Sequence, residues 1–255
     1  MSADDDREPV AVATWNVHGG VGRDGRYDPR RIADVINEIG ADVVALQEVH
    51  SHDAADQLLA TLVARTGYHA VDGWTLKRRG SDFGNAVLSR FPIEEAYRLD
   101  LTVHGCEPRS AVDVVVGAPG GGLRVIATHL GLRPRERRAQ VKRLLGALER
   151  EKPLPTVLTG DLNEWYLWGR PLRWLHRHFK ATPAPRTFPA WRPLFALDRL
   201  WTEPSQLLSY LRVHMSPLAR EASDHLPLVA ELSLPKSGAP DASATDAADA
   251  DPIKA

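Results

Sequence analysis

The segment from Val10 to Val49 constrains the fold more than any other feature, because it reads as a strand, a helix and a second strand. The helix is marked at both ends: Asp28 can cap it, Pro29 stands at its first position and Gly40 ends it. Its apolar residues recur at helical spacing, as one buried stripe requires. They are Ile32, Val35, Ile36 and Ile39. The chain therefore contains a β-α-β unit near its start.

Further strands and helices follow this unit. Residues 10–17 and 42–49 are its two strands, and the second holds an unbroken apolar run before Gln47 and Glu48. More strands are predicted over residues 85–89, 111–116, 123–128 and 156–159, with a hairpin turn at 117–122. Amphipathic helices are predicted through residues 58–63 and onward from Pro134. The class is α/β or α+β with substantial antiparallel pairing.

A single domain is expected to hold the folded part of the chain, which we assign to residues 9–235. At 255 residues the chain is long for one domain, but α/β folds reach this length as one cooperative unit. Residues 1–8 are acidic and polar, and residues 236–255 contain almost no large apolar group. Both ends are therefore predicted to be disordered.

Composition excludes several classes of protein. The longest apolar runs fall far short of the roughly 20 residues that span a bilayer, and the N-terminus lacks a basic, then apolar, secretory leader. Cys106 is the only cysteine, which excludes an internal disulfide and a thiolate zinc site and favours a cytoplasmic location. The formal net charge of −1 gives no global attraction to nucleic acid or anionic lipid, although it leaves local basic patches open.

Polar side chains stand where four of the predicted strands end. They are Asn16, Glu48, His129 and the pair Asp161 and Asn163. Open α/β sheets place ligand sites at such strand ends, where loops free of core packing gather functional groups. One polar residue at a strand end is more often a turn or cap residue. Their coincidence at four strands predicts one cleft.

Two further polar groups extend this pattern. Ser223-Asp224-His225 precedes an apolar alternation, and Asp198 lies inside an apolar run. A charge in such a run is costly unless it is paired, so Asp198 is expected to meet His225, or a neighbouring arginine as plain structure. The whole inventory is rich in oxygen and free of thiols, which suits Mg²⁺ or Mn²⁺. Such an ion polarises a phosphoryl oxygen, while an Asp-Asn pair orients water and imidazoles brace the phosphate.

Five short motifs occur in an order typical of one family. They are Thr14-Trp15-Asn16-Val17, Leu46-Gln47-Glu48-Val49, Thr128-His129-Leu130, Gly160-Asp161-Leu162-Asn163 and Ser223-Asp224-His225. With them the sequence resembles the endonuclease/exonuclease/phosphatase superfamily, whose members include DNase-I-like nucleases, and the matched stretches run from about residue 10 to residue 232. The resemblance implies a four-layered α/β sandwich in which helices flank two central mixed sheets.

The resemblance also implies a set of metal ligands. It makes Glu48 the main ligand of Mg²⁺ (or Mn²⁺), with Asn16 and Asp224 as direct or water-mediated ligands. Asn85, within the segment from Gly84 to Arg90, matches another recurrent family stretch and is expected to line the site as a substrate-binding residue.

Catalytic roles follow from the same resemblance. It implies that Asp161 positions or deprotonates the attacking water and that Asn163 holds the phosphate. It implies that His129 binds a phosphate oxygen, and that His225, oriented by Asp198, stabilises the transition state. Catalysis would then depend on positioning and electrostatics, without a covalent nucleophile.

The stretch from Trp165 to Lys180 bears on the substrate, because it is aromatic and basic and directly follows the Asp161 motif. We expect Trp165 and Arg170 to contact substrate at the rim of the cleft. Three interpretations stay open: a stacking and phosphate-binding rim for nucleic acid, an interfacial anchor for a lipid headgroup, and a partly buried helix with solvated cations. The short chain disfavours an inositol phosphatase, whose larger substrate loops have no counterpart here.

The predicted function is hydrolysis of a nucleic-acid or phospholipid-headgroup phosphodiester by metal-assisted attack of water. One alternative is a phosphomonoesterase that acts on a small phosphorylated metabolite. Another is a binding module that keeps the fold without catalysis, although no expected catalytic residue is missing. The phosphate ester is the expected partner of a monomeric protein, and contact with nucleic acid or with a membrane surface stays open.

Overall fold

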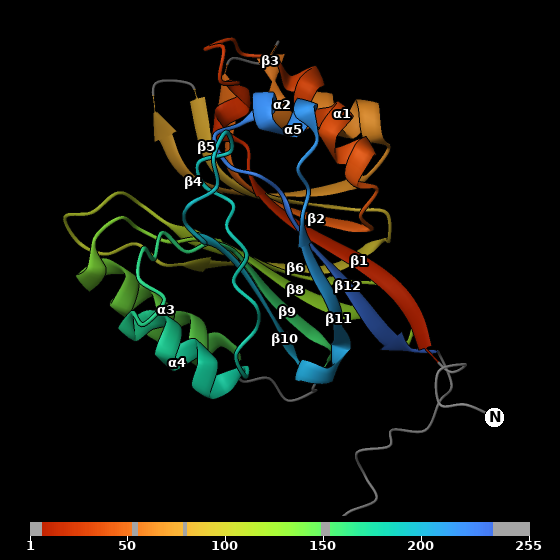
Figure 1. Ribbon diagram of the computed structural model, residues 1–255, viewed down its shortest axis with the longest axis vertical. Coiled ribbons are helices and arrows are strands. Elements are labelled where there is room, and N and C mark those ends of the chain that lie inside the picture. Colours follow the sequence, from red (N-terminus) through yellow and green to blue (C-terminus); the bar gives the residue numbers. More distant parts are fainter. Residues whose placement is uncertain (1–6, 53–55, 79–80, 149–153, 237–255) are drawn as a thin grey trace, which may run out of the picture.

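Two β-sheets packed face to face form the centre of the protein, and helices cover their outer faces (Figure 1). The computed structural model describes residues 7–52, 56–78, 81–148 and 154–236. Most of the two ends predicted to be disordered, residues 1–8 and 236–255, lies outside the described residues, and the first strand begins at Arg7.

The first sheet has the strand order β11–β12–β1–β2–β5–β4, and the short strand β3 pairs with β2. Its strands are β1 (Arg7–Asn16), β2 (Val43–His52), β3 (Asp56–Gln57), β4 (His69–Arg78), β5 (Ser81–Ser89), β11 (Leu208–Val213) and β12 (Leu228–Pro235).

The second sheet has the order β10–β9–β8–β7–β6. Its strands are β6 (Ile93–Asp100), β7 (Ser110–Val116), β8 (Leu123–His129), β9 (Thr156–Asp161) and β10 (Asp198–Glu203). Both sheets are mixed, since β1–β2 and β8–β9 pair in parallel and their other neighbours run antiparallel.

Three hydrophobic cores mark the contacts between four layers. The first core lies between the first sheet and its helices, among them α1 with Ile36. The second lies between the sheets and includes Val12 of β1 and Val114 of β7. The third lies between the second sheet and its helices, where Leu144 and Leu175 are buried. The helices are α1 (Pro29–Ile39), α2 (Leu58–Thr66), α3 (Pro134–Leu148), α4 (Arg170–His178) and α5 (Pro217–Ala222). The predicted four-layered α/β sandwich is therefore confirmed.

Helix α1 begins and ends where its sequence predicts. The Asp28 carboxylate accepts hydrogen bonds from the backbone amides of Arg30 and Arg31, and Pro29 is the first helical residue. Gly40 follows the helix with a left-handed φ of 64°, which glycine adopts without steric cost. All four residues of the predicted apolar stripe are buried.

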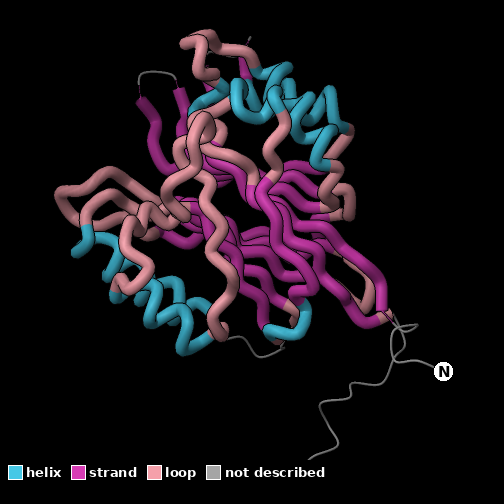
Figure 2. The backbone as a smooth tube through the Cα atoms, viewed as in Figure 1, coloured by secondary structure: helices cyan, strands magenta, loops and turns pink. Residues whose placement is uncertain are grey.

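A long connection without helix or regular strand joins α4 to β10 (Figure 2). An isolated β-bridge between Phe188 and Phe195 closes a turn within it. The amide of Leu226 donates to the carbonyl of Thr187, and the amide of Ala190 donates to the carbonyl of Asp224. These bonds hold the connection against the segment that precedes β12.

Both parallel strand pairs deliver polar residues to one edge of the sandwich. The register places Asn16 opposite Gln47 in the first sheet and His129 opposite Asp161 in the second. Because parallel strands end at the same sheet edge, these side chains come together. At Gly160, with φ of 144°, an added Cβ would lie 1.8 Å from the carbonyl oxygen of Thr128, so glycine permits the close approach of β9 to β8.

Candidate active site

A cavity of about 740 Å³ opens where these strand ends meet. Eight residues singled out in the sequence line it. They are Asn16, Glu48, His129, Asp161, Asn163, Trp165, Asp224 and His225. The predicted cleft at the strand ends is therefore present, and both sheets contribute to it.

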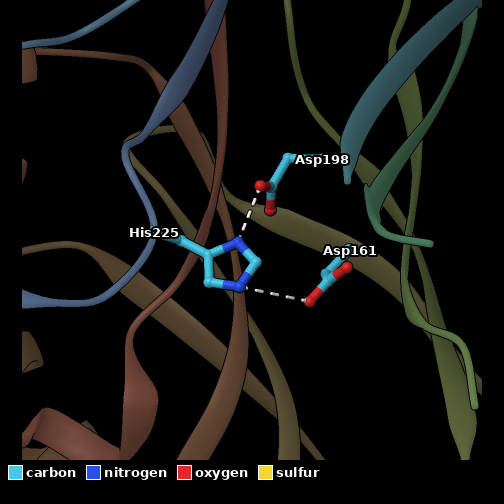
Figure 3. Close-up of side chains that lie close together, drawn as sticks. All are labelled: Asp161, Asp198 and His225. Atoms are coloured by element: carbon cyan, nitrogen blue, oxygen red, sulfur yellow. Dashed lines mark hydrogen bonds and ion pairs between the residues drawn. The ribbon is translucent and has the colours of Figure 1, made fainter. Parts of the chain in front are cut away.

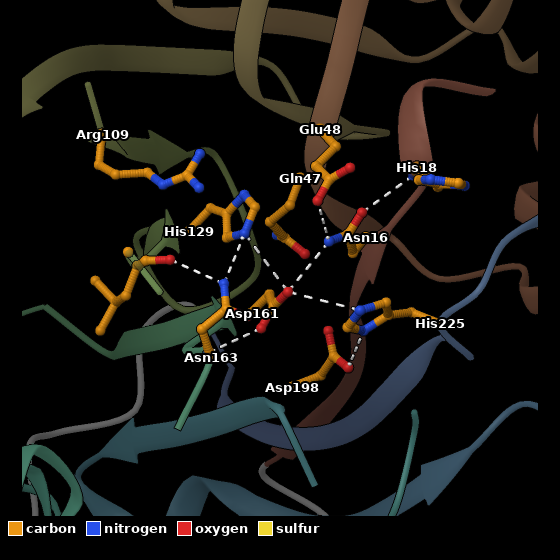
Figure 4. Close-up of polar contacts among 12 residues, drawn as sticks. Asn16, His18, Gln47, Glu48, Arg109, His129, Asp161, Asn163, Asp198 and His225 are labelled. Carbon is orange, nitrogen blue, oxygen red and sulfur yellow. Dashed lines mark hydrogen bonds and ion pairs between the residues drawn. The ribbon is translucent and has the colours of Figure 1, made fainter. Parts of the chain in front are cut away.

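Asp161 is the hub of the polar network (Figure 4). Its Oδ2 accepts a hydrogen bond from Nδ2 of Asn16 at 3.1 Å, and its Oδ1 accepts one from the backbone amide of Asn163 at 2.9 Å. The same Oδ2 lies 3.6 Å from Nε2 of His129 and 3.7 Å from Nε2 of His225. Oδ2 of Asp161 thus lies close to the side-chain amide of Asn16 and to both imidazole rings.

His225 lies between two carboxylates (Figure 3). Its Nδ1 lies 2.8 Å from Oδ2 of Asp198, which is completely buried and also accepts a hydrogen bond from Thr187. Burial lowers the pKa of His225, but the charges of Asp198 and Asp161 and the hydrogen bond to Asp198 outweigh it and raise the pKa to about 10. The imidazole is therefore protonated at neutral pH, and Nε2 carries a proton toward Asp161.

His129 has the opposite protonation state. Burial lowers its pKa to about 3, with the charge of Arg109 acting in the same direction and Asp161 against it. The hydrogen bonds agree with a neutral ring: Nδ2 of Asn163 donates to the carbonyl of Leu130 at 2.9 Å and lies 3.0 Å from Nε2 of His129. Since an amide nitrogen only donates, Nε2 of His129 accepts, and its 3.6 Å approach to Asp161 is not an ion pair.

Glu48 has an unusual backbone conformation, with φ of 55°. The pairing of β2 with β5 shifts register between Leu46 and Val49, so Glu48 lies at an irregularity that directs its side chain into the cavity. Its Oε1 accepts a hydrogen bond from Nδ2 of Asn16 at 2.9 Å. Burial raises the pKa of Glu48, and the nearby carboxylates of Asp161 and Asp224 add to the rise. A non-glycine residue at positive φ costs about 1–3 kcal/mol, a strain found mainly at functional sites.

Two groups of side chains in this cavity could hold a metal ion. Asp161, Asp198 and His225 each offer a ligand atom, and these atoms lie within 4.8 Å of one another. In this group the Asp198 oxygen is already hydrogen-bonded to His225, and that ring is protonated. The second group comprises Glu48, Asp161 and Asp224, which all line the cavity. Burial raises the pKa of Glu48, and the charges of the other two carboxylates add to the rise. A cation beside these carboxylates would relieve part of the repulsion between them, so this second group could also hold a metal ion.

Three predicted site residues lie elsewhere. Asp198 lies behind His225, as its predicted pairing requires. Asn85 is buried, and its amide donates to the carbonyl of Ser110, so it joins the two sheets and is not among the described residues that line the cavity. Arg170, the first residue of α4, is exposed and is likewise not among these residues.

Arg109 lines the cavity but was not predicted from the sequence. It is only 6% exposed, and its Nη2 lies 3.2 Å from the Glu107 carboxylate. Its Nε is buried and has no hydrogen-bond partner among the described residues. The sequence feature that could have identified Arg109 is its position directly before the strand at residues 110–116. The start of that strand lies beside the end of β8, which carries His129. His18 also lines the cavity, and its backbone amide donates a hydrogen bond to the side-chain Oδ1 of Asn16.

Comparisons with known proteins agree with this geometry. The model of the endonuclease/exonuclease/phosphatase family matches residues 13–225. The uncharacterized protein YbhP of Escherichia coli strain K12 is 31% identical over 248 residues, which cover 88% of this chain and 96% of YbhP. Among the described residues, no helix is long and apolar enough to cross a membrane.

Solved structures share the fold. An endonuclease/exonuclease/phosphatase from Beutenbergia cavernae is 30% identical with a TM-score of 0.75, covering 92% of this chain and 73% of that one. Sphingomyelinase C from Streptomyces griseocarneus, 20% identical with a TM-score of 0.64, covers 88% of this chain and 99% of that one, and its likeness concerns the fold alone. The family model, the curated relative and the solved structures lead to the same conclusion: this chain belongs to the endonuclease/exonuclease/phosphatase family.

Proposed function

We propose that this protein is a metal-dependent phosphoesterase that hydrolyses a nucleic-acid or phospholipid-headgroup phosphodiester by metal-assisted attack of water. The observation that carries the proposal is the arrangement of Asp161 between a protonated imidazole, His225, and the carboxylate Glu48 inside one cavity. This arrangement separates a cationic side, which suits a phosphoryl oxygen, from an anionic side, which suits a metal ion.

Glu48, Asp224 and Asn16 would hold the ion, which we propose to be Mg²⁺ or Mn²⁺. The donors are carboxylate and amide oxygens, the ligands that these hard cations prefer. When bound, such an ion polarises a phosphoryl oxygen and neutralises charge on the leaving oxygen. The raised pKa of Glu48 is consistent with this proposal, because burial and the charges of Asp161 and Asp224 disfavour its carboxylate form, which a bound cation would stabilise.

Asp161 is the proposed general base. Its Oδ2 faces the cavity and accepts from Asn16, while its Oδ1 is fixed by the amide of Asn163. A water held by Oδ2 could therefore be oriented toward a phosphorus atom without movement of the carboxylate. No side chain needs to form a covalent bond to the substrate.

His225 is the proposed stabiliser of the transition state. Its proton on Nε2 can be donated to an oxygen on which negative charge develops, while Asp198 fixes the ring through Nδ1. His129, neutral and accepting at Nε2, positions the Asn163 amide, which is proposed to hold the phosphate. Arg109, whose buried Nε lacks a partner among the described residues, adds a cation suited to a phosphate oxygen.

The experiment is hydrolysis by the purified protein of matched panels in the presence of Mg²⁺, Mn²⁺ or EDTA. The panels comprise plasmid and abasic DNA, RNA, sphingomyelin and other phospholipids, and simple mono- and diesters. Metal-dependent turnover of one diester class that disappears in Glu48→Ala supports the proposal and names the substrate. Release of phosphate from monoesters alone would select a phosphomonoesterase, and metal-independent ligand binding without turnover would favour a binding module.

A further inference from the structure

The segment from Trp165 to Leu197 carries an uneven charge. It contains six lysine or arginine residues and no aspartate or glutamate, in a chain whose formal net charge is −1. The cations are Arg170, Arg173, Arg177, Lys180, Arg186 and Arg192, and all six are exposed. Four of the seven tryptophans also fall within this segment. Such a segment attracts anionic surfaces even though the whole chain does not.

An exposed apolar turn opens this segment. Tyr166 is 57% exposed, Leu167 is 58% exposed and Trp168 is 71% exposed, and the Tyr166 and Trp168 rings lie 5.5 Å apart. The amide of Gly169 donates to the carbonyl of Tyr166, which closes the turn. Large apolar side chains gathered on a surface mark an interaction site, whereas single exposed ones carry no such meaning.

The turn borders the cavity of the candidate active site. Trp165 lines that cavity together with Phe188 and Leu132, and its ring packs edge-on against Phe195 at 4.8 Å and Phe188 at 5.9 Å. Leu132 is 65% exposed. Trp191 and Leu194, in the turn that Phe188 and Phe195 close, are also exposed. We call these exposed residues of three neighbouring loops the apolar rim. Its members are Leu132, Trp165, Tyr166, Leu167, Trp168, Trp191, Leu194 and Phe195.

Exposed cations flank each loop of the apolar rim. Arg133 follows Leu132, Arg170 follows Trp168 and Arg192 follows Trp191. The acidic residues beside these loops are turned inward: Glu136 is buried against Gln140, and Glu164 is buried in an ion pair with Arg137 at 3.2 Å. These three loops therefore present apolar side chains and positive charge together, whereas the exposed Glu107 lines the cavity beside Arg109.

We infer that the apolar rim docks onto an anionic lipid membrane, so that the cavity faces the headgroups. Tryptophan and tyrosine favour the headgroup level of a bilayer, leucine partitions into the acyl boundary, and flanking arginines bind anionic lipid. The exposed leucines distinguish this occupant from nucleic acid, because leucine has no aromatic face on which a base can stack. The choice of a headgroup as substrate rests on the proposed function, whereas docking itself does not.

Sedimentation with lipid vesicles tests the inference on the full chain. Binding is measured to vesicles of phosphatidylcholine mixed with phosphatidylglycerol and to vesicles of phosphatidylcholine alone, at low and high salt. Leu167→Ser/Trp168→Ala removes apolar rim side chains that do not line the cavity, and Arg170→Gln/Arg173→Gln removes charge. Tyr210→Ala is the matched control, since Tyr210 is 56% exposed on the edge strand β11.

The wild-type protein and Tyr210→Ala should bind the mixed vesicles equally and the neutral vesicles more weakly. Each double variant should bind the mixed vesicles about tenfold or more weakly, and high salt should weaken wild-type binding. Absence of wild-type binding, or equal binding by all four proteins, would overturn the inference. Binding of a labelled single-stranded oligonucleotide that is lost in Leu167→Ser/Trp168→Ala, without vesicle binding, would overturn it in favour of nucleic acid.

Turnover separates the inference from the proposed function. Hydrolysis of soluble bis(p-nitrophenyl) phosphate should be the same in the wild-type protein and in Leu167→Ser/Trp168→Ala, because neither altered side chain lines the cavity. Vesicle binding without turnover of any ester would contradict the proposed function and leave the docking surface standing.

Discussion

Replacement of Asp198 by asparagine should change how the stability of the protein depends on pH. Asp198 is completely buried, and its Oδ2 lies 2.8 Å from Nδ1 of His225. In the folded protein the pKa of His225 is raised from 6.5 to about 10. Asparagine keeps the size of the side chain and removes its charge, so the variant tests the ion pair with little change in packing.

The sign and the magnitude follow from linkage. A raised folded-state pKa contributes stability that is fully present below about pH 6.5 and is lost as the pH rises through about 10. Since each pKa unit corresponds to about 1.4 kcal/mol, the contribution is on the order of 5 kcal/mol. Breaking a buried ion pair typically costs about 3–5 kcal/mol. Asp198→Asn should therefore lower the free energy of unfolding by about 3 kcal/mol or more at low pH and by much less at high pH.

Urea unfolding followed by circular dichroism at a series of pH values between these limits measures the effect. The difference in unfolding free energy between wild type and variant should shrink as the pH rises. Direct titration of the His225 ring by NMR should show a much lower pKa in the variant. A difference that stays constant with pH, or an unchanged His225 pKa, would refute the claim that Asp198 holds this imidazole protonated.

Three further predictions concern single positions. Gly160→Ala places a Cβ 1.8 Å from the Thr128 carbonyl oxygen, so it should lower the free energy of unfolding by about 3 kcal/mol or more. Thermal unfolding measures this loss, and a variant as stable as the wild type would contradict the described contact. Gly146→Ala, in α3 with nothing within 4 Å of the new Cβ, should instead raise stability by up to about 1 kcal/mol, and a loss would count against the helix assignment. Arg109→Gln should raise the KM for a phosphodiester about tenfold to a hundredfold, because a hydrogen bond to a charged group contributes about 1.5–3 kcal/mol. An unchanged KM would exclude a contact between Arg109 and the phosphate.

Local signals made much of the fold predictable. Helix α1 carries its start at Asp28 and Pro29 and its end at Gly40, and its predicted bounds agree with the structure. Buried strands such as β7 and β8 were evident because runs of mostly apolar, β-branched residues precede and follow a glycine-rich turn, each interrupted by one charged residue, Asp113 or Arg124. By contrast, β6 is largely exposed and reads IEEAYRLD, so it shows neither an apolar run nor a regular alternation. Pairing with β7 at a sheet edge, which is not a local property, makes it a strand.

The candidate site was predictable where its residues end strands. Asn16, His129 and Asp161 converge because the parallel pairs end at one edge, which an α/β pattern implies. Arg109 could not be singled out, because one arginine before a strand has many solvated counterparts and its burial depends on the tertiary fold. Asn85 shows the reverse case, since a family stretch suggested a substrate contact where the described side chain instead joins two sheets.

The dependence of phosphodiester hydrolysis on Mg²⁺ concentration, compared between the wild-type protein and Glu48→Gln, tests the central claim most directly. Glutamine preserves the size of the side chain and removes the charge that we assign to metal binding. With bis(p-nitrophenyl) phosphate as substrate, wild-type turnover should saturate with Mg²⁺ and vanish in EDTA. Glu48→Gln should lose about a hundredfold or more in rate at the same Mg²⁺ concentration while it remains folded. Turnover that resists EDTA, or a Glu48→Gln variant with an unchanged Mg²⁺ dependence, would contradict a metal-assisted reaction at this site.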